Sequence, residues 1–179
     1  LDELWNAALG ELDFLSEARN LKEFRTNNRN VAYVDGPAVW DKLTTRHVLV
    51  MEYIHGVPID DLASLRADGY DLDEIGAKLA ENFIKQIVED RFFHADPHPG
   101  NIRIREGQIV WLDLGMMGRI SSRDGGLLNR GIRAVAENDV EALTDIILAM
   151  GAYTEMPDRL LLGNDIDNFL AKYRQIPLA

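Results

Sequence analysis

Residues 92–115 read FFHADPHPGNIRIREGQIVWLDLG, and this stretch determines how the rest of the chain is interpreted. Two acidic residues, Asp96 and Asp113, flank a predicted β-hairpin, and the amide Asn101 lies between them in the sequence. Carboxylate and amide oxygens suit Mg²⁺, which needs only one or two carboxylates when phosphate oxygens complete its coordination. The stretch therefore predicts a site for a divalent metal and a phosphate.

The spacing of these residues matches the pattern of protein kinases. Asp96 precedes Asn101 by five positions, as in the kinase catalytic loop, and Asp113, Leu114 and Gly115 fall where the metal-binding Asp-Phe-Gly would lie. In that pattern Asp96 orients the attacking hydroxyl or water, Asn101 and Asp113 hold the metal, and Gly115 lets the backbone turn sharply. We therefore predict a phosphoryl-transfer site that uses Mg²⁺, with Mn²⁺ as an alternative metal.

Two histidines near Asp96 leave a second interpretation open. His94 lies where kinases hold a largely structural histidine, and we predict that it supports the loop through backbone contacts. His94, Asp96 and His98 together also resemble the ligands of a zinc or iron hydrolase. Prolines between them interrupt any regular spacing that would bring the three side chains together. The hydrolase reading also leaves the amide and the second carboxylate without a role.

Composition places limits on the class of protein. At 179 residues the chain is long enough for one domain with a sizeable core. Its net charge of -11 argues against a nucleic-acid partner, because phosphate backbones are bound by clustered basic surfaces. The chain has no cysteine and so no disulfide framework. No apolar run reaches the roughly 20 residues that span a bilayer. We expect a cytoplasmic protein, with any peripheral membrane association carried by parts of a longer parent chain.

Hydrophobic periodicity predicts an α+β fold dominated by helices. An amphipathic helix is expected over residues 1–24, and the apolar run HVLVMEYI at residues 47–54 predicts a strand buried on both faces. A longer helix is expected from residue 72 to about residue 90, ahead of the hairpin. The remaining predicted helices are at residues 59–65, 121–137, 140–150 and 157–172.

A kinase layout would place a nucleotide contact at the end of the predicted 47–54 strand. There the backbone of the hinge would hold adenine through Glu52, Tyr53, Ile54 and His55. A plain core strand without a ligand explains the same apolar run equally well.

Three carboxylates of the first predicted helix form an acidic cluster. They are Glu11, Asp13 and Glu17, and Glu17 follows Asp13 by four positions, so these two share a helix face. The residues alone favour a solvated acidic face.

Four segments resemble a known family. They are ELDFLSEARN (11–20), VLVMEYIHGVPI (48–59), HADPHPGN (94–101) and LDLGMMGR (112–119), and together they are similar to the UbiB-type atypical kinases associated with coenzyme Q biosynthesis. The resemblance implies a protein-kinase-like fold, the use of ATP with Mg²⁺, and phosphoryl transfer that supports ubiquinone or other prenyl-lipid metabolism. It also implies lipid or quinone precursors, or a quinone-biosynthesis complex, as partners.

The resemblance changes the interpretation of the acidic helix. It makes Glu11 and Asp13 the Glu-x-Asp motif of the family and Glu17 the other candidate partner of a nucleotide-binding Lys, and the choice between the carboxylates stays open. The Lys-bearing nucleotide loop of the family has no counterpart in this sequence. We therefore expect an amino-lobe remnant with an αC-like helix, two or three strands and the hinge at residues 1–55, a helical carboxy lobe at residues 56–179, and little activity of this chain by itself.

Three other functions remain open from the sequence. Small-molecule phosphotransferases of the aminoglycoside or choline kinase type share the His-x-Asp-x-x-x-x-Asn loop. The metal-dependent hydrolase is the second alternative, and a catalytically dead kinase-like binding module is the third. The intact Asp96, Asn101 and Asp113 argue against a dead module, which has no physical need for all three.

Overall fold

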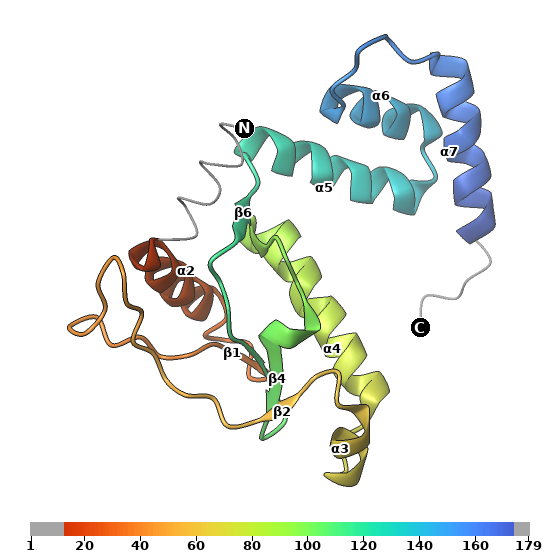
Figure 1. Cartoon of the computed structure of the whole chain (residues 1–179). Coiled ribbons are helices and arrows are strands. Elements are labelled where there is room, and N and C mark those ends of the chain that lie inside the picture. Colours follow the sequence, from red (N-terminus) through yellow and green to blue (C-terminus); the bar gives the residue numbers. More distant parts are fainter. Residues whose placement is uncertain (1–12, 174–179) are drawn as a thin grey trace. The chain divides into compact units, whose positions relative to one another are not determined.

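The structure is a computed structural model that describes residues 13–173 and divides into two compact units (Figure 1). The first unit ends at Arg119 and the second begins at Ile120. Each has its own apolar core. The first half of the first predicted helix, residues 1–12 with Glu11, lies outside the described residues. The predicted lobe boundary near residue 55 stays a prediction.

Two small sheets organise the first unit. One has the strand order β1-β5-β4-β2, in which β1 is parallel to β5 and the other neighbours are antiparallel. Its strands are β1 (Val34–Asp35), β2 (Val57–Pro58), β4 (Ile102–Arg105) and β5 (Gln108–Trp111). The second sheet pairs β3 (Phe92–His94) with β6 (Met117–Arg119), and His94 lies opposite Met117. Because β3 leads into the Asp96 loop and β6 leaves the Asp113 loop, this pairing brings the two loops together.

The predicted β-hairpin is confirmed as β4 and β5. Glu106 and Gly107 form its two-residue turn with φ of 52° and 80°, the left-handed conformation that such a turn requires. Along β4 two isoleucines are buried and alternate with two partly exposed arginines, as expected for a strand with one face on the core. The hairpin thus has a defined register, which fixes the residues at its open end.

Helices cover the sheets of the first unit. They are α2 (Phe14–Asn27), α3 (Leu62–Ala67) and α4 (Leu72–Lys85), followed by a π-helical turn, η1 (Gln86–Asp90), and later by a 3₁₀ turn, η2 (Pro99–Asn101). Each α-helix begins after an aspartate whose side chain accepts a backbone N–H of the first turn: Asp13, Asp61 and Asp71. The long helix predicted from residue 72 is therefore correct in position, but its last turn is π-helical.

α2 is held on the core by apolar side chains spaced three residues apart. Ala18, Leu21 and Phe24 are buried, and the ring of Phe24 lies edge-on to that of Trp111 with ring centroids 6.3 Å apart. Full burial of an apolar side chain of this size contributes about 1.5–3 kcal/mol. The same core contains Leu114, so α2 and the Asp113 loop share one packing unit.

The prediction of a buried strand at residues 47–54 is wrong. The segment makes only single-residue bridges, Thr45 with Val48 and Val39 with Met51, and the exposed fractions of Val48 and Tyr53 are 53% and 75%. A local contact explains part of the difference, because the hydroxyl of Thr44 accepts the N–H of Val50. Such side-chain bonds compete with a strand ladder.

A buried polar network lies under the hairpin and includes side chains of α4 and of the π-helical turn that follows it. The amide oxygen of Asn82 accepts hydrogen bonds from Gln86 at 2.9 Å and from the indole of Trp111 at 3.2 Å. Its amide nitrogen donates to Asn28 at 2.8 Å. Gln86 in turn accepts the backbone N–H of His94 at 3.0 Å. The network therefore links the end of α2, α4 and the strand that leads to Asp96.

Replacing Asn82 with Leu should destabilise the protein strongly. The change leaves buried donors on Trp111 and Gln86 and an acceptor on Asn28 without partners, and each unsatisfied group costs about 1–3 kcal/mol. We expect the free energy of unfolding, measured by urea denaturation, to fall by roughly 2–4 kcal/mol. Asn30→Leu, in an exposed position, is the control and should change it little. Equal effects of the two substitutions would contradict the role of the network.

The second unit consists of three helices, as predicted. They are α5 (Ser122–Glu137), α6 (Val140–Met150) and α7 (Arg159–Tyr173). α5 begins after Ser121, whose hydroxyl caps the helix by accepting the N–H of Asp124 at 3.1 Å. The core of the second unit consists of small and aliphatic residues: Ala134, Leu143, Ile146, Ile166 and Leu170. Within residues 13–173 no helix is both long and apolar enough to cross a membrane.

Candidate functional site

One cavity gathers six of the residues predicted from the sequence. Its volume is about 250 Å³, and it is lined by Phe14, Glu17, His94, Asp96, Asn101, Asp113, Gly115 and Met116. α2 contributes Glu17, the loop after β3 contributes Asp96, and the two ends of the hairpin contribute Asn101 and Asp113. Carboxylates that are distant in sequence therefore face one hollow.

The open end of the hairpin places Asn101 beside the segment of Asp113. Ile102 pairs with Trp111, and one step further the N–H of Leu112 donates to the carbonyl of Asn101 at 2.8 Å. Asn101 therefore directly precedes β4 and Asp113 closely follows β5, the two strands of one short antiparallel pair. Their separation is set by strand geometry and does not depend on a flexible loop.

Three backbone polar groups around Leu114, which belong to two consecutive peptide units, are fixed by side chains. His94 Nε2 donates to the carbonyl of Asp113 at 2.6 Å, Asn20 Nδ2 donates to the carbonyl of Leu114 at 2.8 Å, and Asp113 Oδ1 accepts the N–H of Gly115 at 2.9 Å. The side chain of Leu114 is fully buried. A Cβ at Gly115 would lie 3.2 Å from Asp113 Oδ1, a tight contact that would push on this carboxylate. The carboxylate of Asp113 is thus held in one direction.

His94 is buried and has both ring nitrogens engaged with the backbone. Nδ1 accepts the N–H of Asp96 at 3.1 Å, so Nε2 carries the hydrogen that it donates to Asp113. Burial lowers the pKa of His94, and the bond to Asp113 and the nearby carboxylates oppose this shift. Since neither nitrogen is free, His94 cannot join Asp96 and His98 in a His-Asp-His metal site. Among residues 13–173 no group of three or more His, Asp or Glu is arranged to hold a metal.

The loop from Asp96 to Asn101 is closed by its own backbone. The N–H of His98 donates to the carbonyl of Asp96 at 2.7 Å, and the N–H of Asn101 donates to the carbonyl of His98 at 2.9 Å. The imidazole Nδ1 of His98 accepts the N–H of Gly100 at 3.0 Å. Proline at the start of η2 restricts this turn further. Within the described part of the chain, the side chains of Asp96 and Asn101 make no hydrogen bond. Their oxygens are available to a ligand, and as hard donors beside Asp113 they fit Mg²⁺.

Glu17 reaches the cavity from α2 and is electrostatically opposed to Asp113. Burial raises the pKa of Glu17, and the negative charge of Asp113 raises it further, whereas a hydrogen bond from the backbone of Leu114 lowers it. Two carboxylates that face one hollow repel each other in the absence of a cation. The cavity is therefore suited to a positively charged ligand.

The pH dependence of stability should reveal this repulsion in metal-free protein. Because the folded state raises the pKa of Glu17 above its ordinary value of 4.5, the folded state binds more protons between that pH and the raised pKa. The free energy of unfolding should fall as pH rises through this window. Urea denaturation should therefore find Glu17→Gln more stable than the natural chain at pH 7, with the difference vanishing below about pH 4.5. A difference that does not change with pH would contradict this assignment.

Comparison with known proteins identifies the family. The profile of the ABC1 atypical kinase-like domain matches residues 1–147. This chain belongs to the ABC1 atypical kinase-like family. The resemblance to UbiB-type atypical kinases that the sequence suggested is thereby confirmed.

Relatives within the ABC1 family are longer than this chain. A Clostridium pasteurianum protein described as uncharacterized, from the 5′ region of hydrogenase 1, is 41% identical over 178 residues, covering 99% of this chain and 34% of that protein. The Arabidopsis thaliana protein ACTIVITY OF BC1 COMPLEX KINASE 8, chloroplastic, is 34% identical over 88% of this chain and 21% of its own length. A probable protein kinase UbiB of Tolumonas auensis is 35% identical over 79% and 28%. The chain spans about a fifth to a third of these relatives.

A solved structure confirms the kinase-like α+β fold predicted for this ABC1 chain. The structure of the Rv3197-erythromycin complex from Mycobacterium tuberculosis matches with a TM-score of 0.68 and 25% sequence identity. The match covers 96% of this chain and 43% of that one.

Some residues that the kinase layout and the family resemblance predicted for the site do not line the cavity of Asp96, Asn101 and Asp113. Asp13 caps α2 by accepting the N–H of Leu15 at 3.2 Å, and the hinge residues 52–55 are not part of the lining. Glu52 instead bonds to Arg105 at 2.7 Å, and Tyr53 stacks edge-on with His55. A nucleotide contact at the hinge therefore stays a prediction.

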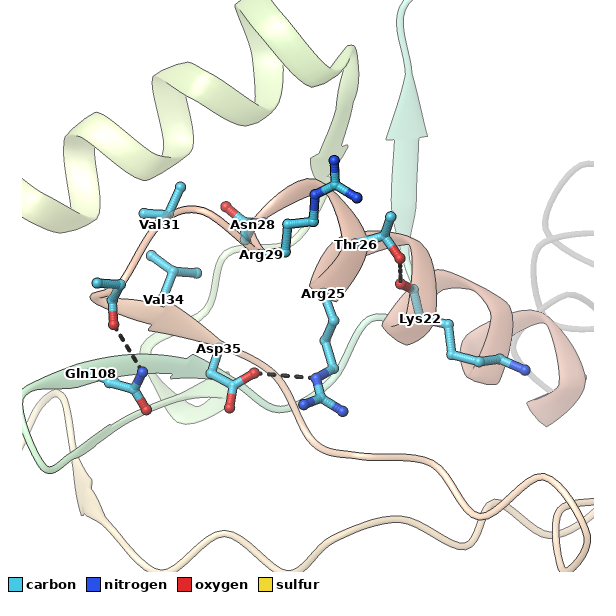
Figure 2. Close-up of a pocket in the computed structure, with 10 residues that line it drawn as sticks. Lys22, Arg25, Thr26, Asn28, Arg29, Val31, Val34, Asp35 and Gln108 are labelled. Atoms are coloured by element: carbon cyan, nitrogen blue, oxygen red, sulfur yellow. Dashed lines mark hydrogen bonds and ion pairs between the residues drawn. The ribbon is translucent and has the colours of Figure 1, made fainter.

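A second, larger hollow lies on another face of α2 (Figure 2). It has a volume of about 720 Å³, and Lys22, Arg25 and Thr26 of α2 contribute to its wall. Figure 2 shows Arg25 directed at Asp35, with which it forms an ion pair at 3.2 Å, and Gln108 bonded to the backbone of the segment after α2. The residues predicted for phosphoryl transfer do not line this hollow.

Sequence reasoning missed two residues that support the site from below. Gln86 holds the backbone of His94, and Asn82 holds Gln86. A signal existed: both are polar, they are four positions apart, and they follow Leu79 on a helix face that is otherwise apolar.

Proposed function

We propose that this chain carries the metal-binding part of an ABC1-family atypical kinase or ATPase that uses Mg-ATP. One observation carries the proposal: Glu17, Asp96, Asn101 and Asp113 line a single cavity although they come from separate parts of the sequence. Phosphoryl transfer requires mainly positioning and charge neutralisation, so a fixed set of hard oxygen donors meets its chief demand.

Each residue has a distinct task in this proposal. Asp96, whose carboxylate has no hydrogen-bond partner within residues 13–173, would orient the attacking hydroxyl or water and accept its proton as the bond to the γ-phosphorus forms and the bond from that phosphorus to the ADP oxygen breaks. Asn101 and Asp113 hold the metal through a neutral and a charged oxygen. A Mg²⁺ ion held by these two side chains would supply positive charge against the charge that develops on the transferred phosphoryl group. His94 does no chemistry and fixes the backbone at Asp96 and Asp113.

We assign Glu17 as the partner of the nucleotide-binding Lys. It faces the cavity beside Asp113, whereas Asp13 is used as a helix cap. A Lys that entered the cavity would relieve the repulsion between Glu17 and Asp113 and would lie near bound phosphates. The Lys itself belongs to a segment that this sequence does not contain.

The substrate proposed for the whole protein is a quinone precursor or another prenyl lipid. This class follows from the resemblance to the UbiB-type atypical kinases, and a probable protein kinase UbiB is among the relatives of this chain. Peripheral attachment to a membrane, through other parts of the parent protein, would give access to such a substrate.

A second candidate is phosphoryl transfer to a small molecule. It is favoured by the matching structure, which is a complex with erythromycin. Transfer of labelled γ-phosphate from ATP to erythromycin, but not to a prenylated quinone precursor, would select this candidate.

Metal dependence of nucleotide binding tests the proposed function. The protein, extended upstream to include the nucleotide loop of the family, should bind ATP in calorimetric titrations with Mg²⁺ or Mn²⁺ and lose most of its affinity in EDTA. The phosphates complete the metal coordination, which explains the mutual dependence. Equal affinity in EDTA, or stoichiometric zinc in elemental analysis, would overturn the proposal.

A further inference from the structure

One face of α2 follows the segment from Asp113 to Arg119 along its length. The face is formed by Glu17, Asn20 and Glu23, which are three residues apart and therefore adjacent on the helix surface. Glu17 lies beside the Asp113 loop, Asn20 donates to the carbonyl of Leu114 at 2.8 Å, and Glu23 pairs with Arg119. The contacts succeed one another in the same order along both segments.

The far end of this segment is also fixed. Arg119 offers two guanidinium nitrogens to the two carboxylate oxygens of Glu23, a bidentate pair with a defined orientation. Its guanidinium carbon lies 4.4 Å from the ring centroid of Phe92, which is buried in β3. Arg119 thus joins α2 to the strand that leads into the Asp96 loop.

We infer that Asn20 is a positioning residue for the metal ligand Asp113, and that Glu23 with Arg119 holds the other end of the same segment. The metal part of this inference rests on the proposed function. In the described part of the chain, Asn20 is the side chain that satisfies the carbonyl of Leu114. Any displacement of α2 therefore moves the peptide next to Asp113, and α2 and the metal loop act as one body.

The chemistry of the contact requires an amide at position 20. Aspartate has nearly the same shape but only acceptor oxygens, so Asn20→Asp would set a carboxylate against the carbonyl of Leu114 and close to Glu17. The matched control is Asn30→Asp, which makes the same chemical change at an exposed position after α2.

Amide hydrogen exchange on the 179-residue chain tests the positioning directly, without metal or nucleotide. In Asn20→Asp, peptides covering residues 112–118 should exchange at least ~10-fold faster, while those covering the hairpin at residues 102–111 keep their protection. Asn30→Asp should change neither. Unchanged protection at residues 112–118, or equal loss of protection throughout the first unit, would overturn the inference.

If Asn20→Asp does not fold, exchanging the charges of Glu23 and Arg119 provides a second test, at the other end of the segment from Asp113 to Arg119. Glu23 and Arg119 are partly exposed, so the chain should tolerate Glu23→Arg and Arg119→Glu. Each single change should accelerate exchange at residues 115–119, and the double variant should exchange more slowly than either single variant because the ion pair re-forms with reversed charges, although the contact of a cation with Phe92 is lost. Absence of rescue in the double variant would contradict the proposed attachment.

Manganese binding separates the inference from the proposed function. Loss of a group that orients a metal ligand typically lowers metal affinity 10- to 100-fold, and we expect a decrease of about this size in Asn20→Asp. Faster exchange with unchanged Mn²⁺ affinity would overturn the role of Asn20 toward Asp113. Absence of a Mn²⁺ site in the natural chain would instead refute the proposed function, and the exchange result would still decide whether α2 holds the loop.

Discussion

Asp96→Asn is expected to lower the turnover number by about 10²- to 10⁴-fold and to leave the affinity for Mg-ATP nearly unchanged. Asn cannot accept the proton of the attacking hydroxyl, but it has the same shape, and the backbone bonds that close the loop do not involve the side chain of residue 96. The measurement is steady-state turnover together with calorimetric titration, on the protein extended upstream to include the nucleotide loop.

A matched substitution makes this result specific. Asp68→Asn removes one negative charge from an exposed position at the end of α3 and should leave turnover as it was. Unchanged turnover in Asp96→Asn, or an equal loss in both variants, would reject Asp96 as the catalytic-loop acid. A loss of ATP affinity equal to the loss of turnover would place Asp96 among the ligand-binding groups.

Asp113→Asn should separate metal binding from folding. The amide oxygen of Asn can still accept the N–H of Gly115, and the buried Leu114 is untouched, so the loop should keep its shape. The substitution removes the negatively charged oxygen that would bind the metal. We expect affinity for Mg-ATP to fall at least ~10-fold, by analogy with the 10- to 100-fold losses from weaker, indirect changes at metal sites.

The same variant should gain stability when no metal is present. Removing the negative charge of Asp113 removes one of the two effects that raise the pKa of Glu17. The variant should therefore resist urea at least as well as the natural chain in EDTA, while binding Mg-ATP less well. A variant that is less stable and also binds normally would show that Asp113 serves structure and does not bind the metal.

The parts of the fold that the sequence predicted correctly are those with strong local signals. The hairpin was readable because Glu106-Gly107 separates two short segments rich in β-branched residues, and α6 because an aspartate cap precedes a regular apolar stripe. The grouping of Asp96, Asn101 and Asp113 follows from the same hairpin, since its open end must bring its flanking residues together.

The failures concern contacts that only the tertiary structure determines. The apolar run at residues 47–54 has the composition of a core strand, but its burial depends on which segments pair with it, and single bridges do not make a ladder. Asn82 and Gln86 look like ordinary polar helix residues, and their importance follows from partners that are distant in sequence, such as Trp111 and Asn28. Likewise Asn20 gains its role only because Leu114 passes next to α2.

Paramagnetic broadening by Mn²⁺ in amide NMR spectra of the 179-residue chain tests the central claim, that Asn101 and Asp113 hold the metal. At low Mn²⁺ concentrations, with and without ATP, the amide signals of Asn101, Asp113 and Gly115 should disappear first, and Asp113→Asn should abolish this preference. Broadening that begins elsewhere on this acidic protein, or that spreads evenly over its carboxylates, would contradict the assignment of the cavity as a metal site.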